Sequence, residues 1–439
     1  MSRVLREPRP DADRPMDFRT CYVGQAVLRQ GQNPYADATL KQGWQHIIRH
    51  EALVSGTQPG LPNLPFLYPP WAAVLFGITM GQMPYALAWP IWYGVTLLSL
   101  LLLAWLWTAV MRLENTQPVP WWQYLVVAVA LKGTVPALLT GQPTFVALAL
   151  GVAALALGSR SSHKLAARRT APMAAEQNTR ATEKAGAGIG PGWAAALAGV
   201  LLGLAAFKVT LLLPFAAWFL WKRQWRTLAV AAAVVALLSA VAWSWAAWPM
   251  GLAPTYQHLL AQVRTQGFDP ADPDYPLTQG LTLRLELGNV LEWLRPGSSP
   301  WHPLLHGALW LAAGLRLGWL RRQDRHLADW YIFLVISTLT LLTTYHLYYD
   351  VVLLLPLLAF GLRLPQRRQR LLLALLLPFL LPLNGVALAL GNPKALHFVY
   401  FLMPLSLLGV LAVLLTWPVG VAGSEAQQAD YREAAPLLH

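Results

Sequence analysis

Residues 193–221 read WAAALAGVLLGLAAFKVTLLLPFAAWFLW, an apolar run of 29 residues interrupted by one cation, Lys208. Two basic loops flank this run: residues 159–192 contain six Lys or Arg, and residues 222–226 contain three. Basic loops of a membrane protein stay on the cytoplasmic side, so the chain has to cross and return within the run. One full crossing takes about 20 residues. We therefore predict two half-helices that meet near Lys208.

The rest of the chain is similarly apolar. Of its 439 residues, 56% are apolar and 12% are charged, and the mean hydropathy is +0.42. Soluble chains carry about 25% charged residues, so an ordinary soluble globule is excluded, as is a disordered chain. Further apolar segments lie at 66–82, 84–111, 121–140, 143–158, 227–247, 303–320, 328–344, 351–362, 371–390 and 397–417. This pattern predicts an all-α polytopic integral membrane bundle with about 10–12 membrane segments, several short or broken.

Loop charge predicts the orientation of the bundle. The loops 159–192, 222–226, 321–326 and 363–370 hold 16 Lys or Arg in 53 residues, whereas 248–302, 345–350 and 391–396 hold 4 in 67. We place the first set in the cytoplasm and the second outside, in a multi-pass plasma-membrane protein. The net charge of +13 follows from this distribution, so it does not indicate a nucleic-acid partner.

The domain organisation follows from the same segments. We expect an outer N-terminal region with juxtamembrane helices (1–65), first membrane segments (66–158), a flexible cytoplasmic linker (159–192), a second membrane bundle (193–417) and a polar tail (418–439). Segment 66–82 stays open. It is re-entrant or two short pieces if residues 1–65 lie outside, and a true span if they lie inside.

A series of short motifs runs along the chain in a fixed order. They are Asp17-Phe-Arg-Thr-Cys-Tyr22, Gly31-Gln-Asn-Pro-Tyr-Ala-Asp37, Phe66-Leu-Tyr-Pro-Pro70, Gly141-Gln142, Gly199-Val-Leu-Leu-Gly203 with Lys208, Trp225-Arg226, and Tyr345-His-Leu-Tyr-Tyr-Asp350. Each motif alone is weak, but the order and spacing resemble glycosyltransferase family 87, one of the C-type (GT-C) membrane glycosyltransferases. The resemblance covers residues 17–417.

The resemblance implies an integral-membrane enzyme that moves a sugar, mannose, from a polyprenyl-phosphate donor to an acceptor hydroxyl, with inversion. The acceptor would be a lipid or a glycan at the outer face, and no metal or other cofactor would be needed. Asp17 matches the family's expected general base. The family has a transmembrane helix before that aspartate, whereas 16 residues precede Asp17 here; we expect a start site further upstream or a chain that lacks the helix.

Two charged residues carry competing interpretations. Asp17 precedes a predicted short helix, residues 18–30, and could be only its N-cap; the resemblance favours the base, and both roles are compatible. Lys208 is an intramembrane cation and hence a candidate for binding the donor phosphate, or a side chain that snorkels to the interface. Lys132 is interpreted as structural.

The outer turn 345–350 gathers further candidates. His346 could bind phosphate or carry a proton, and Tyr349 and Asp350 could contact the sugar or acceptor. An interfacial aromatic belt would explain the tyrosines but not His346 together with Asp350. Tyr68 and Gln142 are assigned to the donor site by the resemblance, although each could simply mark a turn or a helix start.

Tyr35, within the Gly31–Asp37 motif, is assigned to sugar or acceptor contact. No metal site is predicted. Asp269, Asp272 and Asp274 alternate with prolines, a pattern more typical of solvated turns than of a cation site. The pairs His46/His50 and His302/His306 lack the His-Glu-x-x-His order of metalloproteases, and no phosphate-binding or dinucleotide-binding glycine loop is present.

The alternative from another class is a transporter or flippase for a lipid or solute, without covalent chemistry. Broken helices and an intramembrane lysine are also typical of transporters. Transporters often have matching halves, and none are recognisable in this sequence. A third interpretation is an inactive relic, if the first helix is truly absent.

Overall fold

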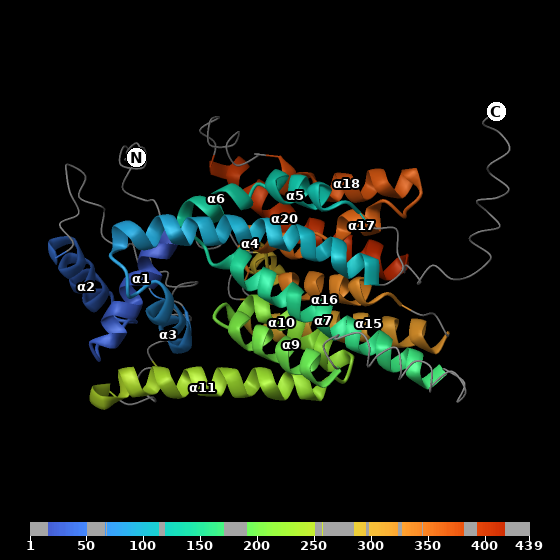
Figure 1. Cartoon of the computed structure of the whole chain (residues 1–439). Helices are drawn as coiled ribbons and strands as arrows, with labels where there is room; N and C mark the ends of the chain where they lie inside the picture. The colour runs from blue at the N-terminus through green and yellow to red at the C-terminus, as the bar shows by residue number, and fades with distance from the viewer. Residues whose placement is uncertain are drawn as a thin grey trace.

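The chain folds as a bundle of helices, which Figure 1 shows from the side. The computed structural model describes residues 16–50, 66, 68–113, 119–170, 191–250, 257, 285–295, 298–323, 327–344, 346–381 and 393–417. The described residues form helices joined by turns, and no strand occurs among them. The all-α fold class is therefore confirmed.

The helices follow the apolar segments. They are α1 Met16–Arg29, α2 Asp37–His50, α3 Pro70–Thr79, α4 Tyr85–Leu113, α5 Trp121–Ala130, α6 Thr134–Thr140, α7 Thr144–Thr170, α9 Pro191–Ala205, α10 Val209–Trp221, α11 Trp225–Met250, α14 Leu287–Leu294, α15 His302–Arg322, α16 Asp329–Thr343, α17 Leu357–Gly361, α18 Gln366–Leu380 and α20 Pro393–Thr416, with 3-10 helices η1 Ser299–Trp301 and η2 Tyr348–Leu354. Helix α7 continues to Thr170, into the predicted linker, because its Ala, Lys and Arg residues favour helix.

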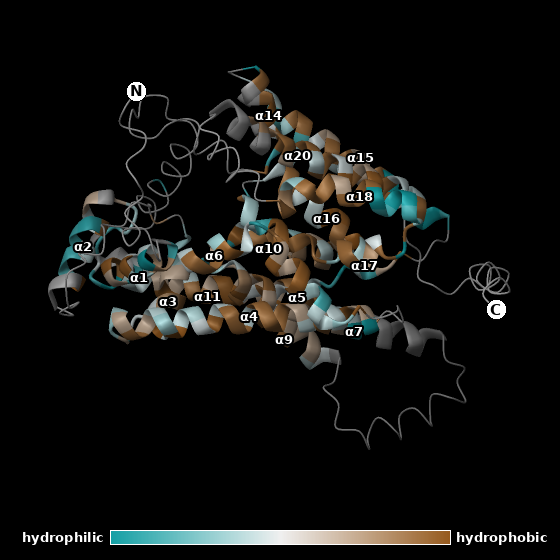
Figure 2. Cartoon of the chain, turned by 90° about the horizontal axis from the view of Figure 1, so that it is seen from above, coloured by the Kyte–Doolittle hydropathy of each residue, from teal (hydrophilic) through white to brown (hydrophobic). Residues whose placement is uncertain are grey.

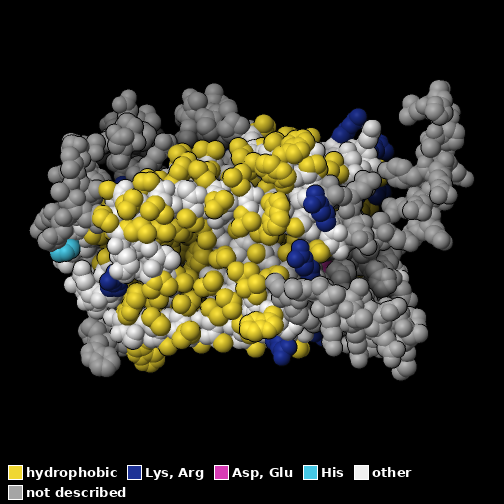
Figure 3. Space-filling view, in the orientation of Figure 1, with side chains coloured by type: hydrophobic (Ala, Val, Ile, Leu, Met, Phe, Trp, Pro, Cys, Tyr) yellow, Lys and Arg dark blue, Asp and Glu magenta, His cyan; other side chains and the backbone are white. Residues whose placement is uncertain are grey.

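The length and composition of the described helices are typical of a membrane protein with many short helices. Two described helices, α4 and residues 225–245 of α11, are long and apolar enough to cross a membrane. The pair α5 and α6 qualifies only as a unit bent by 80°, and six further apolar helices are shorter. Figure 3 shows hydrophobic side chains covering the middle of one face, as lipid contact requires. Helix α3 has ten residues, about half of a full crossing.

The two predicted half-helices are present. Helix α9 ends at Ala205, α10 starts at Val209, and Lys208 is the N-cap residue of α10. Helix α9 packs closely on α11, since a Cβ added at Gly199 would lie 2.6 Å from the Thr227 carbonyl oxygen. Small residues allow membrane helices this close approach. Lys208 therefore lies at the break between the two half-helices.

The N-terminal helices form a smaller core of their own. Helix α2 buries Trp44 against α1, where the guanidinium carbon of Arg19 lies 5.0 Å from the centre of the Trp44 rings. Phe18 of α1 contacts the aromatic rings of α4, including Trp89 and Trp92. These contacts fix the start of α1, and with it Asp17, against the end of the main bundle (Figure 1).

Candidate functional site

A buried ion pair stands at the break between α9 and α10. The Lys208 ammonium donates to Asp350 Oδ1 at 2.7 Å and to Thr144 Oγ1 at 2.5 Å, and lies 4.7 Å from the centre of the Tyr349 ring. The side chains of Lys208 and Asp350 are 12% and 3% exposed. Lys208 therefore points into the protein instead of snorkelling to an interface. Thr144 carried no sequence signal except that it follows the Gly-Gln-Pro turn.

Asp350 also binds the residues of its own turn. His346 Nδ1 lies 3.2 Å from Asp350 Oδ2, and the Leu347 backbone N–H donates to the same oxygen at 3.3 Å. His346 is fully buried, and its Nε2 has no hydrogen-bond partner among the described residues. Asp350 thus holds the lysine with one oxygen and the histidine with the other.

A chain of polar contacts links the ion pair to the N-terminal region. Gln142 Nε2 donates to the Tyr349 hydroxyl at 2.9 Å, and the Tyr68 hydroxyl donates to Gln142 Oε1 at 3.4 Å. The Tyr35 hydroxyl donates to the Tyr68 carbonyl oxygen at 2.9 Å. Tyr35 is 2% exposed, so it supports Tyr68 from behind.

The turn before Gln142 is set by one glycine. Gly141 ends α6 with φ of +71°, a left-handed conformation that glycine adopts without strain. A Cβ added there would meet Phe18 Cβ at 2.7 Å, and Trp92 Nε1 donates to the Gly141 carbonyl oxygen at 2.9 Å. The turn therefore brings α1, α4 and α6 together and directs Gln142 into the site.

Asp17 lies in the first turn of α1, because the helix begins at Met16 and not after the aspartate. An acidic residue is favoured there by the helix dipole. The carboxyl is half-buried and within electrostatic reach of Lys208 and Asp350. Burial raises its pKa to about 6, although Thr140, Gln142 and Lys208 act in the opposite direction. Such a group can accept a proton near neutral pH.

Eight side chains thus form one polar site at the end of the bundle, hereafter the Lys208 site. It consists of Asp17, Tyr68, Gln142, Thr144, Lys208, His346, Tyr349 and Asp350.

The remaining candidates lie elsewhere. Lys132 sits at the α5–α6 break, where its backbone N–H donates to the Phe379 carbonyl oxygen at 2.9 Å. The rings of His302 and His306 are 6.2 Å apart at the start of α15. No group of three His, Cys, Asp or Glu side chains suited to a metal occurs among the described residues, and Asp269, Asp272 and Asp274 lie outside them.

Fold and site together define the class, an all-α membrane protein with a buried ion pair and a half-buried carboxylate in one polar site. The sequence model of glycosyltransferase family 87 matches residues 66–345, well over half of the chain. The chain therefore belongs to this family and is a membrane glycosyltransferase, as its motifs predict. No curated protein and no solved structure matches it.

The family match covers only part of the Lys208 site. Tyr68, Gln142, Thr144 and Lys208 lie inside residues 66–345, whereas Asp17 and the group His346 to Asp350 lie outside. The structure brings both sets together.

Proposed function

We propose that the protein transfers mannose from a polyprenyl-phosphate donor to a hydroxyl of a lipid or glycan acceptor at the extracytoplasmic face, with inversion and with Asp17 as general base. The observation that carries the proposal is the Lys208 site, in which a carboxylate of raised pKa stands near a cation that can receive a phosphate.

The bond changes fix what each group has to do. The acceptor oxygen bonds to the anomeric carbon while the bond from that carbon to the phosphate oxygen breaks. The acceptor proton passes to Asp17, and the bonding electrons leave with the phosphate. Asp17 is suited to this role because it is ionised near neutral pH and only half-buried, so an acceptor can reach it.

The leaving phosphate needs hydrogen-bond donors as its charge grows. An ammonium has three N–H donors, and Lys208 uses two of them on Asp350 and Thr144. We assign the third to a phosphate oxygen. His346 is a second donor candidate in the form with a proton on both ring nitrogens, because its Nδ1 faces the Asp350 carboxylate and its Nε2 is buried without a partner among the described residues. Tyr349, whose ring faces Lys208, is assigned to the sugar.

The direction of the helices supports an extracytoplasmic site. Helix α10 has Lys208 as its N-cap residue and Lys222 as its C-cap residue, about 20 Å apart at 1.5 Å per residue. The last turns of α4 and α15 likewise carry arginines, Arg112 in α4 and Arg321 and Arg322 in α15. On the face that Figure 3 shows, most of the visible Lys and Arg side chains lie toward one end. If that end is cytoplasmic, the Lys208 site faces outward, in a multi-pass plasma-membrane protein.

The test is transfer of radiolabelled mannose from polyprenyl-phosphate mannose in membranes that contain the protein. Asp17→Asn should lower the transfer rate by about 10²–10⁴, the usual contribution of a general base. The control is Asp329→Asn, which removes a carboxylate paired with Lys222 at 2.6 Å near the other end of α10. Transfer that persists in folded Asp17→Asn would refute the assignment of Asp17 as general base. Absence of transfer by the unaltered protein would refute polyprenyl-phosphate mannose as the donor.

A further inference from the structure

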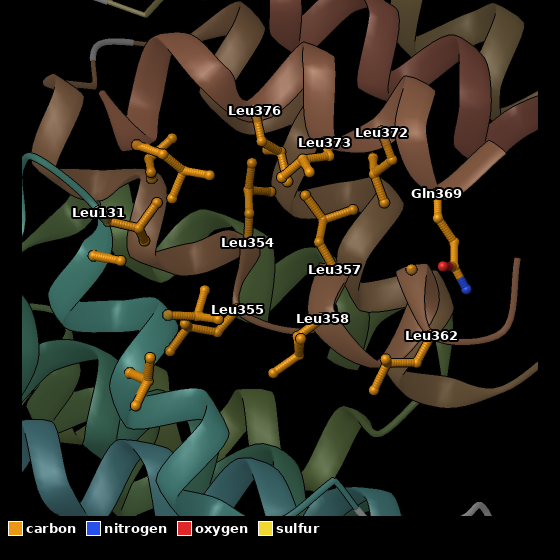
Figure 4. A pocket seen from close by; sticks show the side chains of 16 residues that line it. Leu131, Leu354, Leu355, Leu357, Leu358, Leu362, Gln369, Leu372, Leu373 and Leu376 are labelled. Carbon is orange, nitrogen blue, oxygen red and sulfur yellow. The ribbon is translucent and has the colours of Figure 1, made fainter. Parts of the chain in front are cut away.

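An apolar pocket lies between helices α5, η2–α17 and α18, with a volume of about 420 Å³. Figure 4 shows its leucine side chains directed toward one another from these elements. Ligand pockets span roughly 300–1,000 Å³, so this space is large enough for part of a ligand. Hereafter it is called the leucine pocket. Its lining residues include Leu131 directly after α5, Leu355, Leu358 of α17 and Leu376 of α18.

The lining offers nothing to a polar ligand. Of the sixteen residues that line the leucine pocket, Gln369 alone has a polar side chain. Its Nε2 already donates to the Leu364 carbonyl oxygen at 2.8 Å. An occupant therefore gains by contact with hydrocarbon and finds no group that would select a polar head.

The rim of the pocket is exposed and apolar. Val126, Leu362 and Leu373 line the pocket and are 58%, 59% and 55% exposed. In a membrane protein, exposed side chains of this kind contact lipid chains and not water. A chain can therefore enter the pocket sideways from the bilayer.

Two separate elements run from the leucine pocket to the Lys208 site. In η2, Asp350 binds Lys208, and the next residue, Val351, lines the pocket. Helix α5 forms a pocket wall and continues through the 80° bend into α6, which ends beside Gln142. At the bend, Gly133 packs against the backbone of Tyr349.

We infer that the leucine pocket holds the hydrocarbon chain of the lipid phosphate whose head occupies the Lys208 site. The inference rests on the proposed function, which requires a lipid-phosphate donor. In such a donor the phosphate is bonded directly to the chain, so an apolar pocket has to adjoin the phosphate site. The competing occupant is an ordinary bilayer lipid, which would fill the pocket without binding at Lys208.

Photo-crosslinking tests the inference without any transfer reaction. The probe is a long-chain polyprenyl phosphate that carries a diazirine in its chain and no sugar, added to the full-length protein in lipid nanodiscs. We expect crosslinks to peptides of α17 and α18, displaced by unlabelled polyprenyl phosphate but not by phosphatidylglycerol. The inference would be overturned if α4 and α11 were crosslinked to the same extent as α17 and α18. Displacement by phosphatidylglycerol as efficient as that by polyprenyl phosphate would also overturn it.

Kinetics with two donors give a second test. Leu358→Trp fills the pocket and should raise the KM for a long-chain donor at least about tenfold, a scale typical of lost apolar pocket contacts. The KM for a donor shortened to a single prenyl unit should be unchanged. The matched control is Leu98→Trp in α4, at a side chain 65% exposed and outside the pocket lining.

The outcomes separate this inference from the proposed function. The inference would be overturned if Leu358→Trp raised the KM equally for both donors. It would also be overturned if transfer by the unaltered protein did not depend on chain length. Pocket-specific crosslinking without mannose transfer would support the pocket and refute the mannose donor. If Leu358→Trp does not fold, crosslinking of the unaltered protein still decides the question.

Discussion

At the scale of single residues, the site depends on the ion pair of Lys208 and Asp350. These residues are 142 positions apart in the sequence and meet at 2.7 Å. A charge buried in a membrane protein needs an opposite charge or hydrogen bonds, and each of the two has both. Lys208 without Asp350 would lose its paired carboxylate and keep the Thr144 hydroxyl and the Asp17 charge as its partners.

This dependence gives a prediction about stability. Lys208→Met should destabilise the fold by about 3–5 kcal/mol, because it leaves the Asp350 carboxylate buried without its cation. Lys208→Met combined with Asp350→Leu should recover only part of that loss, because His346 Nδ1 and the Leu347 N–H lose their partner oxygen, and should remain without transfer activity. Thermal unfolding in detergent measures the first effect and mannose transfer the second. A single variant as stable as the unaltered protein would contradict the prediction.

A second prediction concerns pH. The pKa of Asp17 is raised to about 6 by burial, and the base is the ionised form. Below that pH the carboxyl is protonated and cannot accept the acceptor proton. The kcat/KM of transfer should therefore rise with pH up to about 6 and level off above it. Initial rates between about pH 4.5 and 8 measure this, and a rate that falls through the same range would exclude Asp17 as base.

At the scale of elements, turns and helix breaks position the side chains. The break before α10 exposes Lys208 to its partners, and the left-handed Gly141 at the end of α6 directs Gln142 toward Tyr349. Straight spans would have placed these residues along apolar helix faces, where no polar partner could meet them.

Gly141→Ala tests this role. The substitution should cost at least about 1–2 kcal/mol for the left-handed conformation, with further loss from the contact of its Cβ with Phe18 and Trp89. Transfer should fall as well, because Gln142 moves with the turn.

Gly94→Ala is the matched control, since nothing lies within 4 Å of a Cβ added there in α4. It should stabilise the protein by about 0.5–1 kcal/mol. Thermal unfolding compares the two variants, and equal stability would show that the Gly141 turn is not required.

At the scale of the whole molecule, polarity is arranged along the bundle axis. Figure 2 shows hydrophobic helices in the middle and hydrophilic segments toward the ends. Helices α4, α10 and α15 carry their basic residues at the C-terminal end, and in α10 the Lys208 site lies at the opposite, N-terminal end. The positive-inside rule then predicts that the site is extracytoplasmic.

Cysteine labelling tests this orientation. The sole cysteine, Cys21, is buried and would be replaced by Ser. Arg295→Cys and Arg226→Cys, both at exposed positions, would then be labelled with a membrane-impermeant maleimide. We expect labelling of position 295 in intact cells and of position 226 only after permeabilisation. The reverse pattern would place the Lys208 site in the cytoplasm.

The sequence by itself determined the all-α membrane class and the break near Lys208, because apolar length and loop charge are local properties. Its motifs also predicted the family. It could not reveal that Lys208 pairs with Asp350, that Thr144 joins them, or that Tyr35 supports Tyr68, since these contacts join separate helices. Only the tertiary structure decided which residues meet, because a buried cation pairs with whichever carboxylate the packing of the helices brings to it.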